Sequence, residues 1–333
     1  MNNVLFWEAV RGELQAGEPL MLVLVVESRG SSPGRPGFKM AVTSSGRVLG
    51  TIGGGAMEKE LAAQAADLLA RGTGRPRLLK LLHHEGAGGS RPNGSGSTVR
   101  HSGGICSGWQ RLALLPLAGG DSDAVDSLLF ALKRNRPGRL QFSPRGMEFL
   151  PRKSPHGAAV FSLRPAGDWT FREEAGQRPV LTIIGGGHVG LALSRVMAGL
   201  DFHVRVLDDR AELATMEANV FAQEKHVVSY RGIGHRVEEG GQSYAVIMTF
   251  GHEADERVLR QLAGRKLRYL GLMGSPAKIA QIFARLRKKG VSAASLSRVH
   301  APVGLPIHSH TPEEIAVSIA AEIIQVKNQP KQP

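Results

Sequence analysis

The sequence predicts an α/β protein of two domains, a mixed α/β domain followed by a doubly wound parallel sheet. Its 333 residues, 42% of them hydrophobic, are enough to form two cores. From Val180 onward apolar strands alternate with helices, and parallel strands need such helical crossovers. The first half differs, because its apolar strands are separated mainly by short turns rich in Gly, Pro and Ser.

The N-terminal half begins with an expected helix from Val4 to Gln15, followed by the apolar strand "LMLVLVVES". Two further strands, "FKMAVT" and "RVLGTI", lead to a glycine triplet that opens the next helix. Residues 86–104 are rich in Gly and Ser and are expected to form a loop until a ligand or partner orders them. The strand "RLALLPL", a helix near 122–134 and strands near 139–150 and 157–163 complete this domain.

We expect the first domain to span 1–175, with a linker at about 164–179, and the second domain to span 180–328. Residues 329–333 are expected to form a flexible tail. The last helix has a clear start signal, because Thr311 precedes Pro312 and Glu314 stands at the capping-box position.

The composition excludes several classes of protein. A single cysteine, Cys106, excludes a disulfide framework and a cluster of thiolate metal ligands within one chain. The net charge of +13 favours anions, but aromatic residues are few and the basic residues are scattered, so no nucleic-acid partner is expected. No signal peptide or membrane-spanning segment is apparent, so we expect a cytoplasmic protein without membrane contact.

The segment "IIGGGHVGLAL" carries the G-x-G-x-x-G pattern at Gly185, Gly187 and Gly190, between an apolar strand and a helix. Asp208 ends the next strand, where it can accept a hydrogen bond from the hydroxyl of an unphosphorylated ribose. Arg210 keeps the alternative of a phosphorylated ribose open, because an arginine can bind its phosphate. This is the context of a Rossmann-like dinucleotide site, with a phosphate at the start of the helix. Glycines in such a turn also permit close strand-to-helix packing without any nucleotide.

Further polar residues follow later strands of the same sheet, where ligands of such folds bind. His188 lies within the glycine turn, and "FGHEADERVL" supplies His252 and Asp255. Each can contact a ligand, or can simply cap a helix or face solvent. Ser275 and Lys278 in "GLMGSPAKI" offer the same choice between helix capping and anion binding.

A second glycine turn, Gly53, Gly54 and Gly55, also stands between a strand and a helix, but its spacing is neither that of a P-loop nor Rossmann. The segment around it, "VVESRGSSPGRPGFKMAVTSSGRVLGTIGGGAMEKEL", resembles the opening signature of the XdhC/CoxI family, accessory proteins of xanthine dehydrogenase maturation. The blocks "IIGGGHVGLAL", "VRVLDDR", "MTFGHEADERVL", "YLGLMGSPAKI", "APVGLP" and "TPEEIAVSIAAEII" resemble, in order, that family's Rossmann domain.

The resemblance implies a protein that binds molybdenum cofactor (molybdopterin), protects it while a cysteine desulfurase supports its sulfuration, and delivers it to a xanthine dehydrogenase-type apoenzyme. It implies a non-catalytic carrier or chaperone and a homodimer. Under this hypothesis two anion-binding glycine turns face one cleft, because the cofactor is a pterin with a phosphate and a dithiolene-bound metal.

Two further residues enter through the resemblance. Cys106 aligns with a Cys-Gly-Gly stretch of the family and can approach the molybdenum or its sulfur, or can be a small buried hydrophobe. Glu58 matches an acidic position and can accept from pterin nitrogens, although an acidic residue in a first turn also complements the helix dipole.

Two other functions fit the same residues. One is an NAD-dependent oxidoreductase whose Rossmann domain binds NAD, or another nucleotide, although only scattered His and Lys side chains are available for its chemistry. The other is a sensor of a phosphate-bearing effector that acts on a partner protein.

Overall fold

The computed structural model describes residues 3–82, 90–92, 98–101, 108–153, 157, 159–164 and 167–329. The chain forms two compact units, Met1–Gln177 and Arg178–Pro333. The division falls inside the stretch that the composition suggests as a linker. Each unit has its own sheets and its own hydrophobic core.

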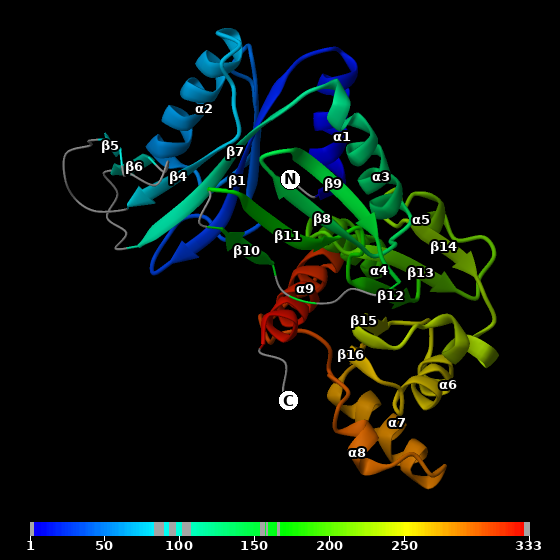
Figure 1. The fold of residues 1–333 in the computed structure, drawn as a ribbon. Coiled ribbons are helices and arrows are strands. Elements are labelled where there is room, and N and C mark those ends of the chain that lie inside the picture. Colours follow the sequence, from blue (N-terminus) through cyan, green and yellow to red (C-terminus); the bar gives the residue numbers. More distant parts are fainter. Residues whose placement is uncertain are drawn as a thin grey trace. The chain divides into compact units, whose positions relative to one another are not determined.

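The first unit contains a seven-stranded sheet of order β3-β2-β1-β7-β4-β6-β5 and a four-stranded sheet of order β10-β11-β8-β9 (Figure 1). Its helical elements are α1 (Asn3–Gln15), α2 (Gly55–Ala70), η1 (Gly119–Asp121) and α3 (Ser122–Lys133). Its strands are β1 (Leu20–Arg29), β2 (Lys39–Thr43), β3 (Val48–Thr51), β4 (Arg77–Leu82), β5 (Ser90–Pro92), β6 (Thr98–His101), β7 (Trp109–Leu117), β8 (Gly138–Ser143), β9 (Gly146–Pro151), β10 (Val160–Leu163) and β11 (Trp169–Ala175).

Strand β1 separates two hydrophobic clusters of this unit. Successive side chains of a strand point to opposite faces, so Leu22 and Leu24 join the cluster formed with α1, α3 and the smaller sheet. Met21 and Val23 face the other way and pack with α2. This burial on both faces explains why the strand reads as a continuous apolar run rather than as an alternating one.

One expectation for this unit was wrong. Within residues 86–104, expected to be a loop, the structure places β5 and β6, and β6 pairs in parallel with β4. The pairing uses backbone groups, which Gly and Ser also carry, so composition is a poor guide here. Strand β11 lies within the stretch 164–179, and its Trp169 and Phe171 side chains belong to the first unit's core.

The second unit is a parallel five-stranded sheet of order β14-β13-β12-β15-β16, as the strand-helix alternation predicts. Its strands are β12 (Val180–Ile184), β13 (His203–Asp208), β14 (Glu224–Val227), β15 (Gly240–Ile247) and β16 (Leu267–Leu272). Its helical elements are α4 (His188–Gly199), α5 (Ala214–Glu217), η2 (Tyr230–Arg236), α6 (His252–Leu262), α7 (Pro276–Lys288), α8 (Ala293–Leu296) and α9 (Pro312–Asn328).

Helices cover both faces of this sheet, as a doubly wound fold requires. Leu193 of α4 and Ile319 of α9 belong to the core on one face, whereas Leu259 of α6 and Ile282 of α7 belong to the core on the other. The capping box at the start of α9 is confirmed, because the Thr311 side chain accepts from the Glu314 amide. Among the described residues, no helix combines the length and the apolar character needed to cross a membrane.

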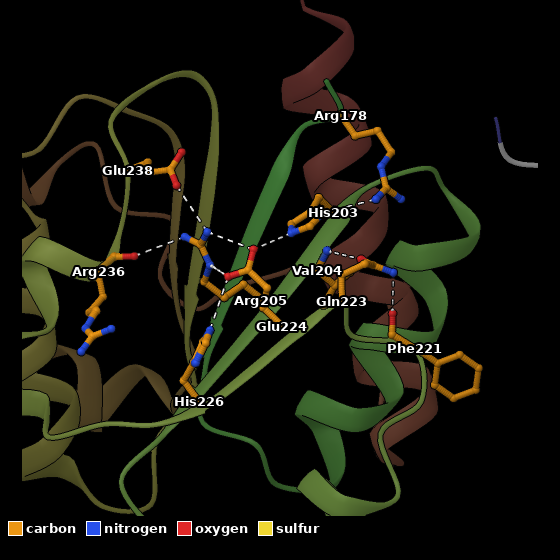
Figure 2. Close-up of polar contacts among 10 residues, drawn as sticks. All are labelled: Arg178, His203, Val204, Arg205, Phe221, Gln223, Glu224, His226, Arg236 and Glu238. Carbon is orange, nitrogen blue, oxygen red and sulfur yellow. Dashed lines mark hydrogen bonds and ion pairs between the residues drawn. The ribbon is translucent and has the colours of Figure 1, made fainter. Parts of the chain in front are cut away.

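The start of β13 carries a polar cluster centred on Glu224 (Figure 2). His203 Nε2 lies 2.6 Å from Glu224 Oε1, and Arg205 donates to both carboxylate oxygens, from Nε at 2.7 Å and from Nη2 at 3.1 Å. His226 of β14 approaches the same carboxylate at 3.4 Å. Three basic side chains therefore converge on one acidic group.

Two groups of this cluster make stability depend on pH. Burial alone would raise the pKa of Glu224, but the contacts with Arg205 and His203 lower it to about 2. Its stabilising contribution is therefore present above pH ~4.5 and is lost as the pH falls toward 2. Burial lowers the pKa of His203, so its contribution is lost as the pH falls below ~6.5.

We predict that Glu224→Gln lowers the free energy of unfolding at pH 7 by about 1–2 kcal/mol, a value reduced for solvent screening of a partly exposed group. The loss should shrink as the pH falls below ~4.5 toward 2, because Glu224 of the unfolded chain takes up a proton in this range while the folded carboxylate is still ionised. Urea unfolding at several pH values measures both effects. Glu238→Gln is the control, since this exposed carboxylate contacts the same Arg205 at 3.3 Å. Equal losses in the two variants would contradict the central role of Glu224.

Candidate functional site

The candidate site lies at the carboxyl edge of the parallel sheet. Strand β12 lies at the centre of the sheet. The chain adds β13 and β14 on one side of it and then returns to add β15 and β16 on the other, so the strand order reverses between β12 and β15. Ligands of open α/β sheets bind at such a reversal point, outside the carboxyl ends of the strands. The turn from β12 into α4 and the loop from β15 into α6 border this point.

The glycines of the β12–α4 turn have separate roles. Gly185 has a φ of +118°, and a Cβ there would lie 2.2 Å from the Met248 carbonyl oxygen at the end of β15. A Cβ on Gly190 would lie 2.4 Å from the Gly185 oxygen. Both positions therefore need glycine for packing. Gly187, the N-cap of α4, has an ordinary φ of −67° and no atom within 4 Å of a Cβ. Packing therefore does not require glycine at this position, and the backbone there is open to close approach.

The Asp208 carboxylate at the end of β13 is fully buried and is already bound by four donors. Its Oδ2 accepts from the Gly186 amide at 2.7 Å and from Arg210 Nη2 at 2.8 Å, and its Oδ1 accepts from the Arg210 amide and Nε. Burial alone would raise the pKa of Asp208, but the bonds from Arg210 and Gly186 hold it below its ordinary value. Asp208 thus ties the glycine turn to Arg210, and a ribose contact would have to displace one of these donors.

Arg210 is held by Asp208 but still reaches the surface, with 38% of its side chain exposed. Its Cζ lies 5.8 Å from the ring centroid of Phe250, a cation-π distance. Phe250 lies in the loop after β15, and 86% of it is exposed. A large aromatic side chain exposed beside an anchored guanidinium, at the ligand-binding edge of the sheet, can stack on a planar ring. Phe250 was not among the residues expected at the site, because only the fold shows its exposure.

Two charged residues expected at the site bind each other. Lys278 Nζ lies 2.6 Å from Asp255 Oδ2, and the buried Asp255 also accepts from the Thr249 amide and hydroxyl through Oδ1. This ion pair links α6 to α7, and Asp255 also holds the loop after β15 through Thr249. Ser275 accepts from the Lys278 amide as the N-cap of α7, which confirms the predicted cap.

His188 and His252 are both exposed at this edge, each as the first residue of a helix, α4 and α6 respectively. Their ring nitrogens are therefore accessible to a ligand of this edge. Within the part of the chain that the structure describes, no group of three or more His, Cys, Asp or Glu side chains is arranged to hold a metal ion.

The first glycine turn lies in the other unit, between β3 and α2. Gly53 needs to be glycine for packing, because its φ is +130° and a Cβ would lie 2.7 Å from Pro33. Gly54 and Gly55 also have positive φ values, +77° and +83°, but the space beside them is open. A Cβ at the start of α2 would therefore meet no other atom at Gly54 or Gly55.

Glu58 holds this turn in place. Its Oε2 accepts from the Thr51 hydroxyl at 2.6 Å, the Ile52 amide at 2.8 Å and the Gly54 amide at 3.0 Å. Burial alone would raise the pKa of Glu58, but these bonds lower it. The carboxylate therefore has a structural role in the turn, beyond a favourable interaction with the helix dipole. Cys106, the other residue taken from the resemblance, lies outside the described residues.

Comparisons with known proteins identify the family. The model of the XdhC and CoxI family matches residues 13–83, and the model of the XdhC Rossmann domain matches residues 181–323. Both halves therefore match parts of one family, in the expected order. The chain belongs to the XdhC and CoxI family.

Three curated relatives match this chain. The protein YqeB of Escherichia coli is 27% identical over 97% of this chain and 46% of its own length. A Bacillus subtilis protein, named as a probable xanthine dehydrogenase component, is 27% identical over 47% of this chain and 46% of its own length. The molybdenum cofactor insertion chaperone PaoD of E. coli is 22% identical over 94% of this chain and 85% of its own length. The matches thus span about half the length of the first two relatives.

A solved structure shares the fold of the whole chain. A crystal structure described as a xanthine dehydrogenase from Bacillus halodurans superposes with a TM-score of 0.74 at 20% identity, covering 100% of this XdhC chain and 98% of that chain. At this identity the similarity establishes the fold.

We predict that Glu58→Ala lowers the free energy of unfolding at pH 7 by about 1–3 kcal/mol, because three donors lose one acceptor. The matched control is Glu60→Ala, two residues later on α2, where the exposed carboxylate accepts from Gln64. That variant should change stability by no more than about 0.5 kcal/mol. Chemical unfolding measures both. If Glu58→Ala were as stable as the control, the carboxylate would not anchor the glycine turn.

Proposed function

We propose that this XdhC protein is an accessory factor for a xanthine dehydrogenase-type molybdenum hydroxylase and carries its molybdenum cofactor. Family membership supports the maturation role, and one relative is named as a molybdenum cofactor insertion chaperone. The observation that carries the binding proposal is the open position at Gly187, at the start of α4. The neighbouring Gly186 amide shares the Asp208 carboxylate with Arg210.

The residues present fit the molybdenum cofactor in two respects. Its phosphate needs amide donors at a position where no Cβ intrudes, and Gly187 provides such a position. Its molybdenum arrives with dithiolene ligands, so it does not require the kind of side-chain metal site that the described residues lack. When bound, the cofactor supplies the molybdenum centre that the target hydroxylase needs.

The chain's own residues would then bind and orient the cofactor. Amide groups at the start of α4 hold the phosphate, and the Arg210 guanidinium adds positive charge. The exposed Phe250 ring stacks on the planar pterin. Gly54 and Gly55 offer a second anion-binding position, and Cys106 remains our candidate for the contact with molybdenum or its sulfur.

The remaining parts of the proposal concern partners. A cysteine desulfurase supports sulfuration of the cofactor while this protein holds it, and the apoenzyme of the hydroxylase receives it. The carrier acts as a homodimer.

A carrier fits the site geometry better than an NAD-dependent oxidoreductase. The acidic residue that would bind the ribose, Asp208, already has four internal donors. The lysine that would be the natural acid or base, Lys278, is paired with the buried Asp255. A hydride-transfer enzyme would need both groups available to its ligands.

We predict that protein co-produced with an intact molybdenum cofactor pathway retains about one molybdenum and one pterin per chain, and that Gly187→Ala lowers this loading about tenfold. The added methyl group occupies the phosphate position without straining the backbone, because the φ of Gly187 suits any residue. Metal analysis and pterin fluorescence after release measure the loading.

The matched control is Gly199→Ala at the other end of α4, where a Cβ also meets open space. It should load as the wild type does. Gly54→Val tests the first turn in the same assay, with circular dichroism to confirm folding, since valine is disfavoured at a φ of +77°. Absence of pterin from the wild type under oxygen-free conditions, with NADH oxidation that Gly187→Ala abolishes, would establish the oxidoreductase instead.

We also predict that Phe250→Ala lowers the affinity of the protein for free pterin about five- to tenfold. The free energy of unfolding should stay almost unchanged. The ring is exposed, so its removal costs little stability, whereas lost stacking costs about 1 kcal/mol of binding. Phe250→Tyr should retain most of the affinity because it keeps the aromatic face. Equilibrium dialysis against the pterin gives the dissociation constants. Equal binding by Phe250→Ala and the wild type would exclude stacking on this ring.

A further inference from the structure

The second unit has a cavity that the proposed cofactor site does not use. It has a volume of about 900 Å³ and lies beside the first half of β16, whereas the candidate site borders the carboxyl ends of the strands. The last turns of α9, the end of α8 and the segment after it complete the walls (Figure 1). Sites for small molecules have volumes of about 300–1,000 Å³, so this cavity is large enough for one.

Two arginines of this cavity carry charges that no described carboxylate offsets. Arg298 lines the cavity, is exposed, and makes no hydrogen bond or ion pair with any residue that the structure describes. Arg268 Nη2 donates to the Val326 oxygen at 2.6 Å and to the Gln329 oxygen at 3.0 Å, near the end of α9. Its side chain also hydrogen-bonds with the Tyr244 hydroxyl. These partners are all neutral, so both guanidinium groups keep their full charge toward an anion in the cavity.

The other charged groups of the lining have internal partners. Arg265 pairs with Glu239 at 3.2 Å. Glu322 is the only acidic residue among the described residues of the lining, and both of its oxygens are bound. Its Oε2 accepts from the Tyr269 hydroxyl at 2.5 Å and from a backbone amide at 2.8 Å, and its Oε1 lies 2.9 Å from His300 Nδ1. Burial alone would raise the pKa of Glu322, but the bonds from His300 and Tyr269 hold it below its ordinary value.

His300 is fixed in the cavity wall with one ring nitrogen left for a ligand. Its amide donates to the Leu270 oxygen and its oxygen accepts from the Leu272 amide, each at 2.9 Å. The centroids of its ring and the Tyr269 ring are 4.5 Å apart. Nδ1 faces Glu322, whereas Nε2 has no hydrogen-bond partner in the part of the chain that the structure describes. A protonated imidazole held in this way donates its Nε2–H to an anion.

We propose that this cavity binds a small phosphate ester, with the phosphate at Arg298 and His300 and the organic group against the apolar part of the lining. A phosphate ester carries about two negative charges at neutral pH, which match the two guanidinium charges. Arginine also binds phosphate through paired N–H donors. Leu267, Leu270 and Val299 provide apolar contacts that inorganic phosphate alone would not use. The site is independent of the proposed cofactor function.

The test uses the full chain and naphthyl phosphate, a phosphate ester with an apolar ring system. Isothermal titration calorimetry should show saturable binding, and Arg298→Ala should weaken it about tenfold through loss of charge-assisted hydrogen bonds. This variant should fold normally, because Arg298 is exposed and has no partner among the described residues. The matched control is Arg287→Ala on α7, an exposed arginine outside the cavity, which should bind the ester as the wild type does.

The place of binding is measured separately, because the proposed cofactor site also offers a phosphate position. The titrations are repeated in Gly187→Ala, in which that position is blocked, and the ester should bind with the same affinity. NMR of isotope-labelled histidine rings should show a shift of the His300 signal on binding, and Arg298→Ala should weaken this response. The His300 signal is assigned by its absence from His300→Gln.

Two related compounds test the chemical class of the ligand. Naphthol keeps the ring system but lacks the anion, and inorganic phosphate keeps the anion but lacks the ring system. Each should bind at least about tenfold more weakly than the ester, because each uses only one part of the cavity.

Four outcomes would overturn the proposal. They are absence of saturable binding, equal binding by Arg298→Ala and the control variant, an unchanged His300 signal in the saturated protein, or binding of naphthol or inorganic phosphate as tight as that of the ester. Loss of ester binding in Gly187→Ala would place the ester at the start of α4 instead and would also overturn it. Failure of cofactor loading leaves this test unaffected, because the titrations do not need the cofactor.

Discussion

The candidate site depends on the close approach of two backbone segments at Gly185. The turn after β12 passes so near the end of β15 that a Cβ would lie 2.2 Å from the Met248 oxygen. This approach brings the two sides of the strand-order reversal together, and it leaves α4 starting at the carboxyl edge with its first amides accessible. A side chain at this position would separate the two strands and move the start of the helix.

Asp208 connects this turn to the exposed side chains beside it. One carboxylate accepts from the Gly186 amide and holds the Arg210 guanidinium, which in turn lies beside the exposed ring of Phe250. The bonds that lower the pKa of Asp208 keep it ionised at neutral pH, so Arg210 stays in place without a ligand. A preformed arrangement of this kind loses less conformational entropy on binding.

The glycine turn of the first unit is fixed in a comparable way by a different residue. Glu58 accepts from the backbone amides of Ile52 and Gly54. These bonds hold the three successive glycines at positive φ, whereas free glycines would sample many backbone conformations. In both turns a carboxylate fixes a glycine-rich segment, and in both the glycine nearest the helix start faces open space. The family resemblance found from these segments agrees with the family that both models identify.

Much of the fold and part of the site follow from the sequence alone. The alternation after Val180 determined the parallel sheet, the glycine spacing located the turn into α4, and Thr311 and Ser275 marked helix starts, because these signals depend on local backbone chemistry. Strands β5 and β6 were missed, since their pairing uses backbone groups that composition does not reveal. The tertiary structure alone decided that Asp208 and Asp255 bind internal partners and that Phe250 is exposed. These properties depend on which residues meet across the fold, and residues distant in the chain carry no local signal of their partners.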